Sequence, residues 1–126
     1  MPEQLYTKTD EYSPDRLIAG NQIPLIAEGI TLSADQGVLK RGTVIGVVTA
    51  SGEGVLVDKS KTDGSEKAYA VLAETVDTTG EVKVTPGYIT GLFNVNELAF
   101  ADEDAIDDHK ITMRERGLYV KDVISY

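Results

Sequence analysis

The chain has 126 residues, of which 41% are apolar, a length and composition that suit one globular domain with a core of its own. Its 12 basic and 21 acidic residues give a net charge of −9, which argues against nucleic-acid binding, because that needs a basic surface to displace counterions from phosphates. There is no cysteine, which excludes disulfides and thiolate chemistry, and no window has the roughly 18 consecutive apolar residues of a membrane span.

The first 13 residues are polar and show neither helical nor strand periodicity. Leu5, Tyr6 and Tyr12 are their main apolar anchors, and Pro14 follows. Such a segment cannot bury enough surface to offset the entropy lost on ordering. We therefore expect a flexible N-terminal arm at 1–13 ahead of a single domain at 14–126. The arm is either an ordinary frayed terminus or an extended segment that orders on a partner by strand addition.

The first half of the domain is predicted to consist of short strands. Two are expected at 23–27 and 29–32, and Pro24 places the first at a sheet edge. The stretch 37–48 combines a polar turn, Lys40-Arg41-Gly42, with Val44, Ile45, Val47 and Val48. Branched side chains fit a pleated surface, so residues 44–50 are predicted to form a buried strand, followed by a short one at 55–57.

The second half begins with a polar stretch, 58–67, which we interpret as an exposed loop with Asp63-Gly64 at its tip. A strand at 68–74 should pair with or pack beside the strand at 44–50. Val82 and Val84 alternate with charged residues, as on a half-buried strand at 81–84. Pro86-Gly87 has the order that a type II turn prefers, and a strand at 88–95 follows, with Gly91 as a candidate bulge.

One helix is expected, and it begins near Asp102. Acidic residues crowd its start, basic residues fall in its last turns, and Gly117 follows, which is the order that the helix dipole favours. Ile106, His109 and Met113 share one face and should pack on the sheet. A last strand at 118–124 completes a mainly β domain with a single helix in its C-terminal half.

The sequence gives little sign of catalysis or of a metal. His109 is the only histidine, and on a helix face it is more typical of a packed or solvated residue than of a catalyst. The acidic run 102–108 lacks the alternating ligands and central glycine of an EF-hand loop, and helix-start acid explains it more simply. We expect no enzyme activity, no cofactor and no metal site.

Lys40 suggests an alternative function. Small β domains of the biotinyl and lipoyl carrier class present a lysine on a hairpin turn for modification. The Met or Asp-Ala neighbours of those turns are missing beside Leu39-Lys40-Arg41-Gly42. A small β domain that carries or binds a small molecule through the Lys40 turn is therefore the second hypothesis.

Four segments in order carry a resemblance to a known family. They are Pro14-Asp-Arg-Leu-Ile-Ala-Gly20, Gly37-Val-Leu-Lys-Arg-Gly-Thr-Val-Ile-Gly46, Ala68-Tyr-Ala-Val-Leu-Ala-Glu74 and Gly91-Leu-Phe-Asn94. Together they resemble the lambda-type head decoration proteins of tailed bacteriophages, over roughly residues 13–98.

The resemblance implies a β-clip-like domain that forms a homotrimer on the outside of the expanded phage head, at threefold and quasi-threefold sites. It implies that the arm binds the major capsid protein, and Leu5, Tyr6, Thr7, Tyr12 and Pro14 are the expected capsid-binding residues. Trimer contacts would come from exposed apolar side chains, for which Leu92, Phe93 and Tyr119 are the candidates. The expected location is the outer surface of the virion, after synthesis in the host cytoplasm, with neither nucleic acid nor membrane as a partner.

Overall fold

The computed structural model describes residues 17–20 and 23–121, and over these ranges the chain is mainly β with one α-helix, as predicted. The division into an arm and a domain remains a prediction, because residues 1–16 lie outside the described ranges. The strands are β1 (Ile18–Gly20), β2 (Ile26–Leu32), β3 (Val38–Leu39), β4 (Val44–Val47), β5 (Gly54–Leu56), β6 (Ala68–Leu72), β7 (Val76–Asp77), β8 (Lys83–Asn94) and β9 (Leu118–Lys121); a short 3-10 helix, η1 (Val95–Glu97), precedes the α-helix α1 (Ile106–Glu115).

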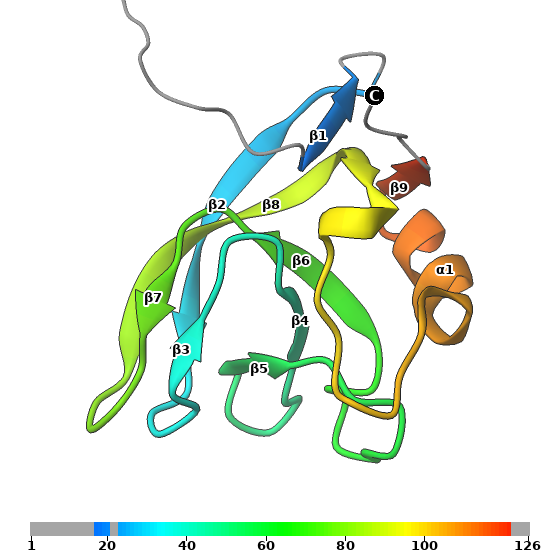
Figure 1. Ribbon diagram of the computed structural model, residues 1–126. Helices are drawn as coiled ribbons and strands as arrows, with labels where there is room; N and C mark the ends of the chain where they lie inside the picture. The colour runs from blue at the N-terminus through cyan, green and yellow to red at the C-terminus, as the bar shows by residue number, and fades with distance from the viewer. Residues whose placement is uncertain (1–16, 21–22, 122–126) are drawn as a thin grey trace, which may run out of the picture.

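Strand β8 organises the sheet. Its first part pairs antiparallel with β2, and β2, β5, β4 and β6 then follow as neighbours. Because β6 returns to pair with β8, these five strands close on themselves as a small barrel. Beyond the barrel, β8 continues between β1 and β9. The helix α1 lies at one side of the barrel and the two-stranded β3–β7 sheet at the opposite side (Figure 1).

The alternation of side chains along β4 and β6 creates two cores, one on each face of the sheet. Val44 and Val71 point to a cluster that includes Phe93 and, from α1, Met113. Ile45 and Leu72 point the other way, into a cluster with residues of β2 and β3. All of these side chains are essentially inaccessible to solvent, which confirms that the stretches around 44 and 68 are buried strands that pair with each other. β4 ends at Val47, three residues earlier than predicted.

The predicted turn at Pro86-Gly87 is wrong. Both residues lie inside β8, opposite Gly29 and Glu28 of β2. Glycine is needed at position 87 because a Cβ there would come within 2.7 Å of the Ile30 side chain. Pro86 has no N–H to donate, and it takes part in the sheet through its carbonyl, which accepts a hydrogen bond from the Ala73 N–H at 3.1 Å. One strand of twelve residues therefore replaces the two strands and the turn expected here.

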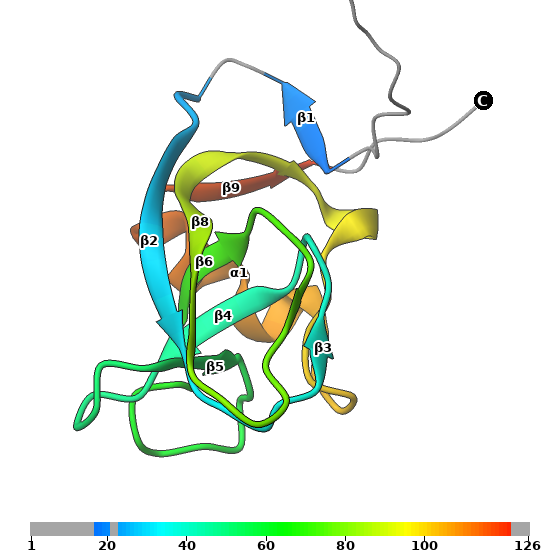
Figure 2. The ribbon, with the colours of Figure 1, turned by 90° about the vertical axis from the view of Figure 1, so that its left-hand side faces the viewer.

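The neighbouring strand predictions need two further corrections. The two pieces expected at 23–27 and 29–32 form one strand, β2, which pairs with β8 along its whole length (Figure 2). Over the described residues, β2 meets β5 only at Leu32, so most of its other edge is open. Pro24, on which the predicted edge position rested, lies outside β2, which begins at Ile26. The predicted buried face at 81–84 is wrong, because Val84 is 73% exposed and Thr85 is buried instead.

The helix begins later than expected and ends where expected. Asp102 does not cap it; instead α1 starts at Ile106, where the Asp108 carboxylate accepts a hydrogen bond from the Ala105 N–H at 2.8 Å. Gly117 adopts φ 88° just beyond the C-cap residue, as predicted for a helix-terminating glycine. His109 and Met113 are buried on the face toward the sheet, as predicted. Within the described ranges, no helix is long and apolar enough to cross a membrane.

Gly46→Ala is expected to destabilise the fold by about 1–3 kcal/mol, the usual cost of overpacking. A Cβ at this position in β4 would collide with the backbone of Ser65, which is itself buried. Gly29→Ala in β2 is the matched control, because its Cβ would make only an ordinary contact with Val84 at 3.6 Å. Urea unfolding of both variants measures the difference, and equal stability of the two would contradict this packing argument.

Candidate functional site

The far end of β8 brings together strands from the two ends of the described chain. β8 pairs there antiparallel with β1, through Ile18 and Phe93, and parallel with β9 on its other side. The Asn94 N–H donates a hydrogen bond to the Leu17 carbonyl at 2.7 Å, and Lys121 pairs with Asn94 across from it. Neighbouring strands lie about 4.8 Å apart, so β1 and β9, on either side of β8, lie roughly 10 Å from each other.

The expected capsid-binding residues all belong to the segment that precedes this point. Leu5, Tyr6, Thr7, Tyr12 and Pro14 lie outside the described residues. The segment that contains them precedes β1 in the sequence. Over the described residues, β1 pairs only with β8.

The three candidate trimer residues separate into two groups. Leu92 and Tyr119 are register partners on β8 and β9, and they are half-buried and 37% exposed, respectively. Phe93 points to the opposite face, is fully buried, and packs against Tyr88 with ring centroids 5.9 Å apart. A side chain with no exposed surface cannot reach a second copy without a rearrangement of the core. Only Leu92 and Tyr119 therefore remain candidates for direct contact.

Arg41, and not Lys40, makes the contacts that hold the Lys40 turn in place. Arg41 donates hydrogen bonds to the Ala73 carbonyl at 2.8 Å and to the Tyr88 hydroxyl at 3.0 Å. Its guanidinium also lies 5.6 Å from the centroid of the Tyr88 ring. Lys40 itself is exposed beside this anchor. The turn thus exposes the Lys40 amine to solvent. The contacts of Arg41 are sufficient to explain the fixed geometry of the turn.

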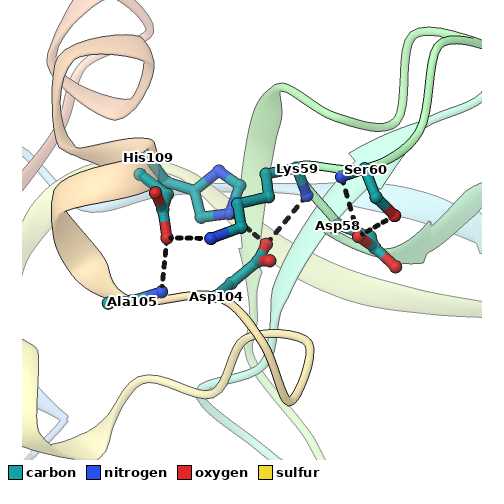
Figure 3. Close-up of polar contacts among 7 residues, drawn as sticks. Asp58, Lys59, Ser60, Asp104, Ala105 and His109 are labelled. Atoms are coloured by element: carbon teal, nitrogen blue, oxygen red, sulfur yellow. Dashed lines mark hydrogen bonds and ion pairs between the residues drawn. The ribbon is translucent and has the colours of Figure 1, made fainter.

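The most concentrated polar cluster lies where α1 meets two loops (Figure 3). His109 Nε2 and Asp104 Oδ2 are 2.6 Å apart, and their side chains are 1% and 0% exposed. The same carboxylate oxygen accepts the Lys59 backbone N–H at 2.9 Å. Phe100 stacks on the imidazole, with centroids 5.3 Å apart and planes 9° from parallel. The cluster therefore joins the helix to the loop before it and to the loop after β5.

This burial identifies His109 as a packed residue, in agreement with the sequence analysis. A histidine–carboxylate pair can orient an imidazole for catalysis, but a ring sealed by Phe100 presents no nitrogen to a substrate. Sequence reasoning found His109 and missed its partners Asp104 and Lys59. The only signal in the sequence was that Asp104 lies five residues before His109. For the two side chains to meet, the chain must turn back just before the helix begins. Among the described residues, no group of three or more histidines and carboxylates is arranged to hold a metal ion.

Two carboxylates beside the cluster have perturbed acidity. Hydrogen bonds from the Ser60 hydroxyl and backbone N–H lower the pKa of Asp58 below its usual 3.8. The Ala105 N–H, aided by Lys59, lowers the pKa of Asp108 in the same direction. Both shifts favour the ionised carboxylate, so these residues keep their negative charge at any neutral pH.

His109→Ala is expected to lower the free energy of unfolding by roughly 3–5 kcal/mol, because it leaves the Asp104 carboxylate buried without its partner. Asp107→Ala, on the solvent side of the same helical turn, is the control and should change stability by about 0.5 kcal/mol or less. Chemical denaturation followed by circular dichroism measures both. Similar small losses in the two variants would show that the buried pair contributes little.

Acid should weaken the attachment of the helix. Because the folded-state pKa of Asp108 lies below the unfolded value, its contribution is fully present above pH 3.8 and disappears as the pH falls through the folded-state pKa. Asp108→Asn should therefore cost stability at pH 6, and the loss should shrink as the pH falls below 3.8. Urea unfolding at several pH values tests this, and a pH-independent loss for Asp108→Asn would contradict it.

The comparison with protein families agrees with the resemblance carried by the four sequence segments. The family model described as bacteriophage lambda head decoration protein D matches residues 6–120, which includes every strand and helix described above except the last residue of β9. A search of individually curated proteins gave no match. The matched span covers nearly the whole chain, and the chain therefore belongs to the bacteriophage lambda head decoration protein D family, a structural family of the phage capsid.

Proposed function

We propose that the chain stabilises an expanded phage head from the outside, as a homotrimer at threefold and quasi-threefold sites. Residues 14–126 form the decoration domain, and the arm, residues 1–13, binds the major capsid protein. The protein is made in the host cytoplasm and ends on the outer surface of the virion. Membership of the head decoration family supports the capsid location, and the net charge of −9 suits a surface that faces away from packaged DNA.

The observation that carries the role of the arm is its attachment to an edge strand. Leu17, whose carbonyl accepts a hydrogen bond from the Asn94 N–H, directly precedes β1. Over the described residues β1 pairs with β8 alone. A segment that arrives in line with an edge strand is suited to continue as a strand on another sheet, where backbone hydrogen bonds supply affinity.

The length of the arm fits this task. Thirteen extended residues span up to about 45 Å, enough to cross from the domain onto a neighbouring capsid subunit. In our proposal Leu5, Tyr6 and Thr7 form the added strand, and Tyr12 and Pro14 contact the capsid near the domain. A trimer presents three such arms to one threefold site, so weak single contacts combine into tight binding.

The family favours this function over the Lys40 carrier hypothesis. The surroundings of the turn agree, because Arg41 and not Lys40 makes the contacts that fix its shape. A protein that clamps a capsid needs contact area and rigidity and no catalytic group. The closed barrel supplies the rigidity.

Deletion of residues 1–13 is expected to leave folding intact and to abolish binding to expanded capsid shells. Pelleting with shells, with occupancy read by gel densitometry, measures binding, and circular dichroism measures folding. A second variant replaces residues 1–13 with glycine and serine at equal length and should also fail to bind. Lys40→Ala is the control and should decorate fully. Full occupancy by either arm variant would refute the proposed role of the arm.

A further inference from the structure

An acidic cleft of about 510 Å3 lies beside the start of α1. Four carboxylates lie along it, and we call this set the acidic cleft: Asp58, Asp102, Glu103 and Asp104. Asp102 and Glu103 are exposed and form neither an ion pair nor a hydrogen bond with any other described residue. Lys59 also lines the cleft, but its ammonium is engaged with Asp108 at 3.3 Å. The cleft thus carries an excess of uncompensated negative charge.

One wall of this cleft is a buried carboxylate that is only half satisfied. The Asp104 side chain is 0% exposed, and its Oδ2 is used by His109 and Lys59. Its other oxygen, Oδ1, is buried without a hydrogen-bond partner among the described residues. Buried carboxylate oxygens normally accept at least one hydrogen bond. Because Oδ1 is buried, a second copy does not reach it directly, and the exposed carboxylates of Asp102 and Glu103 are the groups that the cleft offers to a cationic donor.

The same chain carries a cationic surface at the other end of α1. Lys110 and Arg114 are one helical turn apart on the solvent side, next to Tyr119 of β9, and these three residues line one small depression. We call Lys110, Ile111, Arg114 and Tyr119 the basic face. Ile111 is 75% exposed, the highest exposure among the large apolar side chains of the described residues. Neither Lys110 nor Arg114 pairs with an acid in that part of the chain, although the protein as a whole has a large acidic excess.

The two surfaces cannot satisfy each other within one copy. They lie toward opposite ends of α1, and the nine residues from Ile106 to Arg114 span about 12 Å of helix. The helix dipole accounts for acid at the start and base at the end. It does not account for exposed carboxylates that line a cleft or for an exposed isoleucine beside two unpaired cations.

We propose that the basic face of one copy docks against the acidic cleft of the next copy, with the Arg114 guanidinium entering the cleft. Arginine suits this role because its planar fork donates to two carboxylate oxygens at once. The contact joins different surfaces of the two copies, so it is head-to-tail and closes into a ring after a fixed rotation. Ile111 and Tyr119 supply apolar contact beside the charges. This inference rests on the trimer of the proposed function, for which it names the subunit contact.

A charge-swap experiment on the full chain tests the contact. The face variant is Lys110→Glu with Arg114→Glu, the cleft variant is Asp102→Lys with Glu103→Lys, and the combined variant carries all four changes. Lys40→Glu, in an exposed turn away from both surfaces, is the control for charge reversal. Native mass spectrometry and light scattering measure the trimer in solution, pelleting with expanded shells measures it on the capsid, and circular dichroism confirms folding.

The face and cleft variants should each weaken trimer formation at least tenfold, and the combined variant should restore it to within about threefold of the wild type. Rising salt should weaken the wild-type trimer, because exposed charges are screened. Trimers in both separate variants, or no recovery in the combined one, would overturn the contact and leave the decoration function standing. A face variant that trimerises normally but leaves shells undecorated would instead assign the basic face to the capsid. Failure of the wild type itself to trimerise, in solution and on shells, would reject the trimer and this inference together.

Discussion

Backbone pairing along a single strand, β8, is the constraint on which the rest of the structure depends. Its first part closes the barrel through β2 and β6, and its last part holds β1 on one side and β9 on the other. A strand so heavily shared cannot be shifted by one residue without exposing Phe93 and burying polar neighbours. The strands β1 and β9 therefore take their positions from the register of β8.

The sequence predicted those elements in which the pattern of apolar side chains shows directly which residues are buried. The branched residues around Val44 and the apolar stretch at 68–74 identified two paired strands, and Gly117 identified the end of the helix. Pro86-Gly87 misled because the glycine serves close packing against Ile30, and a local pattern does not reveal a contact with a residue 57 positions away. The same limitation hid the pairing of Asp104 with His109, since a loop conformation, and not a periodicity, brings them together.

The surface around α1 shows how one internal interaction arranges several external ones. Asp104 turns inward to His109, which ends the acidic stretch as a loop and delays the helix to Ile106. Asp102 and Glu103 are left on the rim of a cleft, and Lys110 and Arg114 appear on the solvent side of the helix. A buried polar pair thus determines which charges are available to another molecule, and a chain without it would present a different outer surface.

The pairing of β1 with β8 also governs the order in which the protein can be assembled during synthesis. Ile18 needs Phe93, and β2 needs the first part of the same strand, so a growing chain holds β1 and most of β2 without partners until Asn94 has left the ribosome. Contacts between residues so distant in sequence make folding slow and expose strand edges meanwhile. The acidic excess then has a second use, because mutual repulsion between unfinished chains opposes their aggregation while they wait for β8.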